Sequence, residues 1–318
     1  MAAELAFNLL PSSLVMRLII QPEAGIVPVV TAIKQAKRSV NILIFRLDRY
    51  EIARALADAV KRGVRVRALT AHTNRGGTKS LRKLEMDLLE AGVTVSRTAD
   101  DLVRYHGKMM IVDNKILHVY GFNLTGLDIK SRSFGVITKN SKLVNEAMKL
   151  YFADFDRLSY TPGYERLVVS PENARERLGR FISGARKQLL IYDPQVSDDA
   201  MLRLLSERIE AGVDVRVIGK VESKWNVTCE KYPGKRLHIR AIVRDGKRAF
   251  VGSQSLRRLE LEGRREVGVI VTDQAVVKQM GETFERDWAQ TNCGRKQLKK
   301  AEKAEKAEKR ELKLAAVS

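Results

Sequence analysis

Two short stretches of this chain share one spacing of residues that could act on a phosphate ester. Each has a histidine, a cation two residues later, an aspartate seven residues after the histidine, and a turn shortly beyond. In the first stretch these residues are His106, Lys108, Asp113 and Gly121-Phe122-Asn123. In the second stretch they are His238, Arg240, Asp245 and Gly252-Ser253-Gln254-Ser255. The repetition indicates one active site assembled from two halves.

Two imidazoles flanked by two cations suit an anionic phosphodiester. We assign His106 as the nucleophile, which would attack phosphorus and form a covalent phosphohistidine. We assign His238 as the general acid for the leaving oxygen and then as the base for water or an alcohol, although the reverse order is chemically allowed. Lys108 and Arg240 would hold the non-bridging oxygens and offset charge in the transition state. Because these groups supply all of the chemistry, we expect no metal ion and no cofactor.

The aspartates and the local backbone complete the two motifs. Asp113 and Asp245 recur at the same spacing, so we count both as catalytic residues. We expect each histidine and its cation on a strand, because alternation would put both side chains on one face of the sheet.

The two motifs lie within a longer internal repeat. Residues 62–67 match residues 211–216 at an offset of 149, whereas the histidines are 132 apart, so the second copy is shorter by 17 residues. The missing piece includes residues 80–90, where apolar residues recur at helical spacing. In both copies apolar strands alternate with helices, which predicts an α/β fold in which helices cover the faces of a sheet.

The repeat divides the chain into three parts. We predict one half over residues 1–160 and a second half over residues 161–293, joined near residues 160–163, where proline and glycine favour a linker. Residues 294–318 form a basic tail rich in alanine, glutamate and lysine, which has almost no apolar stripe. We expect a solvated helix or a disordered segment there, with docking on phosphates as the alternative.

Composition narrows the partners and the compartment. The formal net charge of +20 favours polyanions: a phospholipid or other phosphodiester substrate, nucleic acid, or an anionic membrane surface. Cys229 and Cys293 lie in no CxxC motif or Cys/His cluster, which argues against a zinc site or a disulfide framework. Neither a signal peptide nor a transmembrane segment is indicated. We therefore expect a cytoplasmic monomer, with peripheral binding to a membrane as a further option.

The duplicated motif, with its downstream turns, resembles the phospholipase D superfamily. The likeness covers about residues 17 to 273, and it includes Arg265-Glu266-Val267-Gly268 after the second motif. It implies two repeated α/β/α halves that form a pseudo-dimer with one shared active-site cleft. That family includes phospholipases, cardiolipin and phosphatidylserine synthases, nucleases and a tyrosyl-DNA phosphodiesterase, so the resemblance indicates the chemistry better than the substrate.

The chain also departs from the family pattern. Arg240 stands where the family has lysine, Ser255 replaces an asparagine that Asn123 retains, and Tyr120 occupies the place of a small residue, where it could narrow the cleft. The family often carries a carboxylate after the turn that orients an imidazole: Glu266 fits this role, whereas the first copy has Ser133. The residues that we expect at the substrate are Asn123, Ser253, Ser255 and Glu266.

Three functions stay open at this point. The first is a metal-independent phosphodiesterase that hydrolyses phospholipids or transfers their headgroups. The second is the same chemistry on nucleic acid, which the basic charge favours, although aromatic residues for base stacking make up only 6% of the chain. The third is a catalytically degenerate member that binds polyanions, which the departures from the motif favour.

Overall fold

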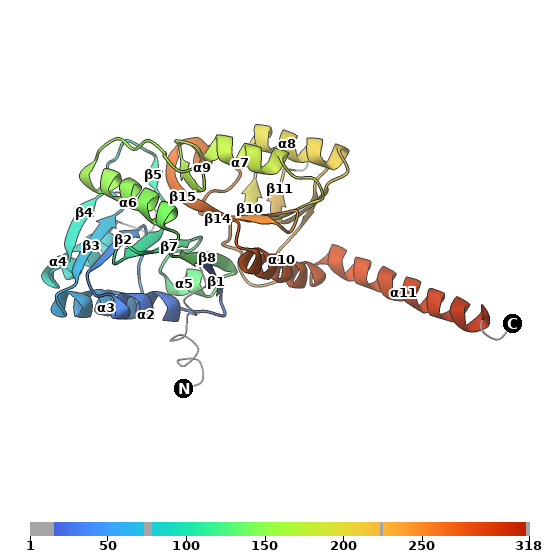
Figure 1. The fold of residues 1–318 in the computed structure, drawn as a ribbon, viewed down its shortest axis with the longest axis horizontal. Coiled ribbons are helices and arrows are strands. Elements are labelled where there is room, and N and C mark those ends of the chain that lie inside the picture. The colour runs from blue at the N-terminus through green and yellow to red at the C-terminus, as the bar shows by residue number, and fades with distance from the viewer. Residues whose placement is uncertain (1–15, 73–77, 223–224, 316–318) are drawn as a thin grey trace.

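The computed structural model describes residues 16–72, 78–222 and 225–315 and contains two mixed sheets (Figure 1). The first sheet is formed by β1 (Met16–Gln21), β2 (Ser39–Ile44), β3 (Arg65–Thr70), β4 (Thr94–Arg97), β6 (Met109–Val112), β7 (Ile116–Tyr120) and β8 (Ser133–Thr138). Its order is β1-β8-β7-β6-β2-β3-β4, in which β2 pairs with β3 and β3 with β4 in parallel, whereas the other neighbouring strands are antiparallel. All six residues of β2 are buried, and β2 lies between β6 and β3 in the sheet.

The second sheet repeats this topology. Its strands are β9 (Leu167–Ser170), β10 (Gln188–Val196), β11 (Asp214–Val221), β12 (Thr228–Glu230), β13 (Ala241–Arg244), β14 (Arg248–Gly252) and β15 (Arg264–Val271). The order is β12-β11-β10-β13-β14-β15, with β9 paired to β15, so each strand has a counterpart in the first sheet. One strand of the first half, β5 (Arg104–Tyr105), also joins β15. The structure confirms the predicted α/β fold with two repeated halves.

Helices pack against both sheets. The first half has α2 (Val27–Gln35), α3 (Tyr50–Lys61), α4 (Thr78–Glu90), α5 (Gly126–Ile129) and α6 (Ser141–Asp156). The second half has α7 (Ala174–Ser183), α8 (Asp199–Glu210), α9 (Arg258–Glu262) and α10 (Gln274–Ala289). In Figure 1, α2 and α3 lie on one side of the molecule and α7 and α8 on the opposite side. The extra helix of the first half is α4, which matches the piece absent from the second copy.

Sequence signals account for the paired helices α3 and α8. Each presents a buried apolar face, which includes Leu56 in α3 and Leu205 in α8. Asp198 caps the start of α8 by accepting a hydrogen bond from the Met201 N–H at 3.1 Å. Both helices are followed closely by a glycine with positive φ, Gly63 or Gly212, a conformation that other residues rarely adopt. The same helix ends therefore recur in both halves.

The inner faces of the two sheets share one hydrophobic core. This core combines buried residues of the first sheet and α6 with buried residues of the second sheet and α10. Within it, the Phe134 ring of β8 meets the Tyr192 ring of β10 edge to face, with centroids 5.8 Å apart. Two separate cores lie under α2 to α4 and under α7 to α9. The halves are thus joined through a common interior.

Two arginines, one from each half, tie the halves together in equivalent ways. Arg265 lies 3.1 Å from Asp154 of α6 in the first half, and Arg132 lies 2.9 Å from Asp287 of α10 in the second half. Each arginine also pairs with a glutamate of its own half, Glu172 for Arg265 and Glu23 for Arg132. These crossed ion pairs fix the relative position of the sheets.

Replacing Arg265 with methionine is expected to lower the free energy of unfolding by about 3 kcal/mol, because Asp154 would stay buried without its cation. Urea unfolding measures this loss. Arg258→Met is the matched control, since its ion pair with Glu262 is exposed and such pairs contribute about 0–1 kcal/mol. A loss below about 1 kcal/mol for Arg265→Met would show that the crossed pair does not hold the halves together.

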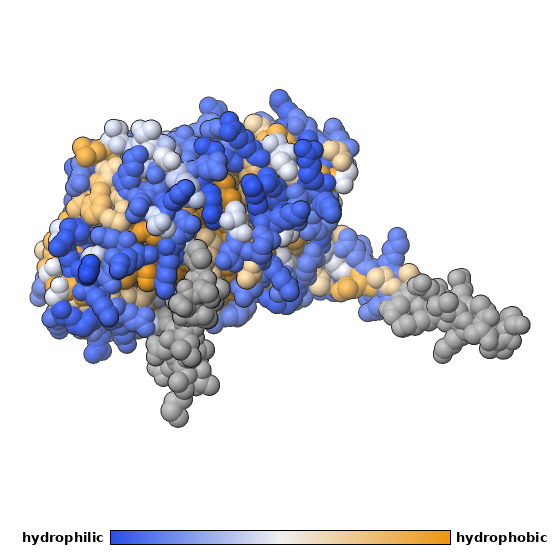
Figure 2. Space-filling view, in the orientation of Figure 1, coloured by the Kyte–Doolittle hydropathy of each residue, from blue (hydrophilic) through white to orange (hydrophobic). Residues whose placement is uncertain are grey.

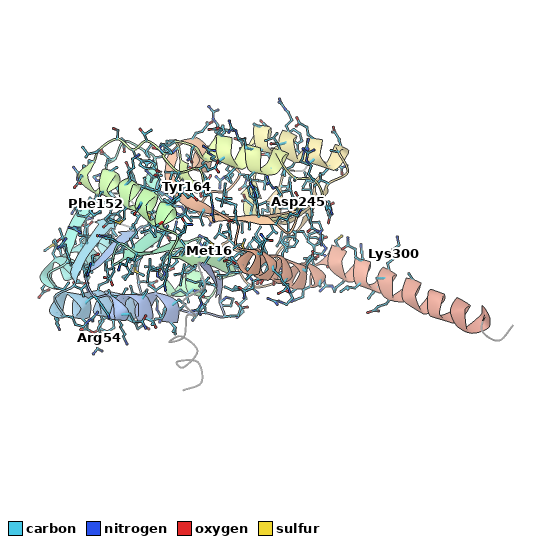
Figure 3. All side chains as sticks on the ribbon, viewed as in Figure 1. Met16, Arg54, Phe152, Tyr164, Asp245 and Lys300 are labelled. Atoms are coloured by element: carbon cyan, nitrogen blue, oxygen red, sulfur yellow. The ribbon has the colours of Figure 1, made fainter. Side chains whose placement is uncertain are left out.

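The described part of the tail lies in one helix, α11 (Asn292–Ala315), which projects away from the two sheets (Figures 1 and 2). Lys300, labelled in Figure 3, lies on this projecting part. All side chains over residues 295–304 are exposed. Of the two forms predicted for the tail, a solvated helix or a disordered segment, these residues adopt the helix with exposed side chains.

Two further findings apply to the described part of the chain. None of its helices combines the length and the apolar character that a bilayer-spanning segment needs. No group of three or more His, Cys, Asp or Glu side chains within it is placed to hold a metal ion.

Candidate active site

The two histidine motifs lie in extended segments that cross from one sheet to the other. His106, Gly107 and Lys108 connect β5, which joins the second sheet, to β6 of the first sheet. The His106 and Gly107 N–H groups donate to the Arg265 carbonyl at 2.7 and 2.9 Å. The prediction that the histidine and its cation sit within a strand is wrong, because this segment leaves one sheet before it enters the other.

The second motif crosses in the opposite direction. Leu237 forms an isolated bridge with Arg132 of the first half, and the His238 N–H donates to the Arg132 carbonyl at 3.0 Å. The chain then enters β13 of the second sheet. Each crossed arginine therefore holds the backbone of the opposite half's histidine, which brings both motifs to the junction of the halves.

His106 and Glu266 form a buried pair across this junction. The Nδ1 atom of His106 lies 2.9 and 3.0 Å from the two carboxylate oxygens of Glu266, and Glu266 is fully buried. Burial, together with the charges of Lys108 and Arg240, holds the pKa of His106 well below its usual value. A neutral imidazole that donates its Nδ1–H to a carboxylate leaves the Nε2 lone pair available for attack.

His238 has a weaker carboxylate partner in Asp128 of α5. The Nδ1 atom of His238 lies 3.5 Å from an Asp128 oxygen and makes no hydrogen bond with the described residues. Asp128 also pairs with Arg236 and accepts a hydrogen bond from the side chain of Asn123. Although burial opposes it, the charges of His238 and Arg236 lower the pKa of Asp128 to about 2. Asp128 thus stays ionised beside His238 and can stabilise its protonated form.

Both motif cations lie among these groups. Lys108 is 2% exposed and donates to the His106 carbonyl. Its Nζ atom lies 5.3 Å from the centre of the Phe45 ring, and Arg46 and Arg104 lie 5.4 Å from the same ring. Arg240 lowers the pKa of His106, and Lys108 lowers the pKa of His238, so each cation acts on the other half's imidazole.

Lys108 gives the site a pH dependence. Burial and repulsion from Arg240 lower its pKa to about 7, although Glu266 opposes this shift. Lys108 is therefore charged below pH 7 and loses its charge above it. We expect the Kd for diethyl phosphate, whose single charge is constant, to rise about tenfold between pH 6 and pH 9. NMR titration measures this change in Kd. The Lys108→Arg variant keeps its charge at both pH values, so its affinity should not depend on pH. A constant affinity in the unaltered chain would contradict the proposal that Lys108 loses its charge near pH 7.

The predicted substrate residues act mainly as supports. Asn123 holds Asp128, and Ser253 accepts the Val267 N–H at 3.1 Å and hydrogen-bonds Glu266. Burial raises the pKa of Glu266, and the charge of Lys108 and the Ser253 hydrogen bond oppose this shift. Ser255 accepts a hydrogen bond from the Arg240 guanidinium at 3.3 Å. Asn123, Ser253, Ser255 and Glu266 are all at most 5% exposed. They lie around the imidazoles, where they position the groups that would contact a substrate.

Asp113 and Asp245 lie apart from the imidazoles. Asp113 follows β6 at a left-handed turn and accepts hydrogen bonds from the N–H groups of Lys37, Arg38 and Ser39 at 2.6–3.1 Å. Asp245 makes the equivalent bonds to residues 186–188 at 2.7–3.1 Å. Figure 3 labels Asp245 toward the outer end of the second half. We infer a structural role in place of the catalytic role predicted for both.

We expect Asp113→Ala to lower the free energy of unfolding by about 2–4 kcal/mol, because three backbone donors lose a charged acceptor. The kcat/KM should change less than threefold. Chemical unfolding and steady-state assays on one preparation separate the two effects. A fall in kcat/KM of more than about 100-fold with unchanged stability would restore the catalytic role.

Two departures from the family motif have different consequences. Tyr120 packs in the core of the first half beside Phe122, with ring centroids 5.2 Å apart. It therefore does not narrow the site, contrary to the prediction. Ser133 is fully buried next to Arg132, as Glu266 is next to Arg265, and its hydroxyl has no hydrogen-bond partner among the described residues. Because the first half has serine at the position where the second half has Glu266, His238 has no carboxylate partner equivalent to that of His106, and Asp128 is the acid beside it.

Two residues of the site, Asp128 and Phe45, were not predicted from the sequence. Asp128 had a signal, since it matches Glu260 at the same offset of 132 that relates the histidines. No pattern marks Phe45, because its contacts come from the fold.

Comparison with known proteins agrees with this geometry. A family described as "Cardiolipin synthase, PLD-like domain" matches residues 29–158 and 178–288, which covers both halves and both motifs. The chain belongs to this family. The predicted phospholipase D relationship and the pseudo-dimeric fold are thereby confirmed.

Individual relatives of this phospholipase D-like chain are distant. The major cardiolipin synthase ClsA of Bacillus subtilis (strain 168) is 24% identical, over 80% of this chain and 65% of that protein's length. The polyphosphate kinase from Porphyromonas gingivalis superposes with a TM-score of 0.70 at 19% identity, over 85% of this chain and 50% of the kinase. The phosphatidylserine synthase of Haemophilus influenzae Rd KW20 gives a TM-score of 0.66 at 9% identity, over 87% of this chain and 86% of that one. These structures share the fold.

Proposed function

We propose that this chain catalyses metal-independent transfer at the phosphodiester of a phospholipid, through a phosphohistidine on His106. The main support for the proposal is the group of residues at the junction of the halves, where the His106–Glu266 pair lies among Lys108, Arg240 and His238. A neutral nucleophile, a second imidazole and two cations are the groups that such a reaction needs.

The reaction would proceed in two displacements. The Nε2 atom of His106 forms a bond to phosphorus while the bond from phosphorus to the leaving oxygen breaks, and His238 gives its proton to that oxygen. Water or an alcohol then passes a proton to His238 and attacks phosphorus, which breaks the bond to His106. Water gives hydrolysis, and an alcohol gives transfer of the phosphatidyl group.

His238 must be protonated for the first step. In the free protein, burial and the charge of Arg240 hold the pKa of His238 well below its usual value. A bound phosphodiester anion would offset Arg240 and Lys108, so substrate binding itself should raise this pKa. Asp128 then stabilises the imidazolium.

The preference for lipid rests on the family. Its description names cardiolipin synthase, and so does the name of the Bacillus relative. This proposal is tested with anionic and zwitterionic phospholipid vesicles in EDTA, with and without added glycerol, by chromatography of the products. Headgroup release or a new phosphatidyl alcohol supports the proposal, and no lipid turnover contradicts it.

A nucleic-acid phosphodiester is the second candidate, because the net charge of +20 attracts such polyanions. Single-stranded and duplex DNA in the same EDTA buffer form the second arm of the assay. DNA cleavage without lipid turnover would favour this candidate.

A further inference from the structure

A cavity of about 760 Å³ lies apart from the imidazoles, between α2 and strands β1, β7 and β8. Most of its wall is apolar: Pro28, Ala32, Ala36, Val112, Ile116 and Ile137. Small-molecule sites have volumes of about 300–1,000 Å³ and combine an apolar lining with few polar groups. This cavity therefore has the size and the lining of a ligand site.

Four cations lie around the apolar wall. They are Arg17, Lys34, Lys37 and Arg62. Arg62 donates to the Ile33 carbonyl at 3.1 Å, and the Lys34 and Lys37 side chains are exposed. The acid in the lining, Asp113, already accepts three backbone hydrogen bonds. The net charge at the rim of the cavity is positive, which suits an anionic group.

His118 adds a buried polar group to the wall. It is 1% exposed, and its Nδ1 atom has no hydrogen-bond partner among the described residues. Buried polar atoms normally have a partner, so an unpaired one at a cavity wall points to a ligand. Burial and the charge of Arg17 lower its pKa to about 3, so the imidazole is neutral.

We propose that this cavity binds a single-chain anionic amphiphile, with its acyl chain against the apolar wall and its phosphate group at the basic rim. The site is distinct from the junction of the halves, since it lies on the outer, α2-covered side of the first sheet. Its occupation does not depend on the proposed reaction.

Dodecyl phosphate, below its micellar concentration, tests the proposal by isothermal titration calorimetry on the full chain. Dodecanol keeps the chain without the anion, and inorganic phosphate keeps the anion without the chain. We expect dodecyl phosphate to bind at least about tenfold more tightly than either probe. Equal binding of inorganic phosphate would overturn the proposal, because the apolar wall would then contribute nothing.

Matched variants locate the binding. The double variant Lys34→Glu with Lys37→Glu should raise the Kd for dodecyl phosphate about tenfold, through loss of attraction at the rim. Lys142→Glu with Lys247→Glu makes the same charge change at exposed lysines elsewhere and should change the Kd less than twofold. Ala32→Trp should remove binding by filling the cavity.

Lys108→Ala separates this site from the active site. It removes a cation from the junction and should leave the Kd for dodecyl phosphate unchanged. If Lys108→Ala abolished binding while the Lys34 and Lys37 variant did not, the amphiphile would lie in the active site and the inference would fail. Failure to trap a phosphohistidine would overturn the proposed reaction and leave this binding intact.

Discussion

Replacing His106 with alanine is expected to lower kcat/KM for phospholipid by about 10⁴-fold or more, because the group that forms the covalent intermediate is lost. Lys108 and Arg240 would still bind the substrate, so KM should change little. Initial rates of headgroup release in EDTA measure the loss.

His72→Ala is the control for this variant. His72 is an exposed histidine outside the two motifs, and its Nε2 atom lies 3.9 Å from a carboxylate oxygen of Asp100. Its replacement should leave kcat/KM within twofold of the unaltered chain. Full activity of His106→Ala would remove His106 from the reaction and favour His238 as the nucleophile.

Glu266→Gln is expected to have the second-largest effect, a loss of about 10³–10⁴-fold in kcat with a similar KM. The amide has the shape of the carboxylate, but it cannot hold the Nδ1–H tautomer of His106 as a buried carboxylate does. Glu266 is fully buried and lies within 3.0 Å of His106, so the loss of kcat should follow from its carboxylate alone. Because glutamine has the same shape, the circular dichroism spectrum should not change.

Asp128→Asn is the matched comparison, because it removes the carboxylate beside the other histidine. We expect a smaller loss of about 10–100-fold, since Asp128 lies 3.5 Å from His238 and makes no hydrogen bond to it. If Asp128→Asn were the more damaging variant, the two histidines would have exchanged roles. The pair of variants therefore tests the assignment of the nucleophile.

Much of the fold was predictable because the chain repeats itself. The constant offset between residues 62–67 and residues 211–216 indicated two repeated halves, and the sheets do share one strand order. The two histidines and the two motif cations were found for the same reason, since the same spacing appears twice. A local spacing that occurs twice can be recognised in the sequence without knowledge of the contacts made by the rest of the chain.

Contacts between the halves were not predictable. The strand placement of His106 failed because its backbone is held by Arg265 of the other half, 159 positions later in the chain. The supporting role of Asp128 likewise depends on Arg236, which comes from the second half. Such contacts join residues that share no spacing, so they emerge only when the sheets are placed together.

The two aspartates of the motif, Asp113 and Asp245, were found by their repeated spacing, but we infer a structural role for them in place of the catalytic role predicted. Asp113 and Asp245 recur because each closes the same turn in its own half, at the end of a strand. Repetition in a sequence marks what both halves need in order to fold as well as what both need in order to react.

The most direct test of the account is to trap the covalent intermediate. A short-chain phospholipid is mixed with the chain in EDTA, quenched under alkaline conditions that preserve phosphohistidine, and digested for mass spectrometry. We predict one phosphatidyl adduct, on His106, that is absent from His106→Ala. An adduct on His238 alone, or turnover without any adduct, would contradict the central claim that His106 is the nucleophile of a shared active site.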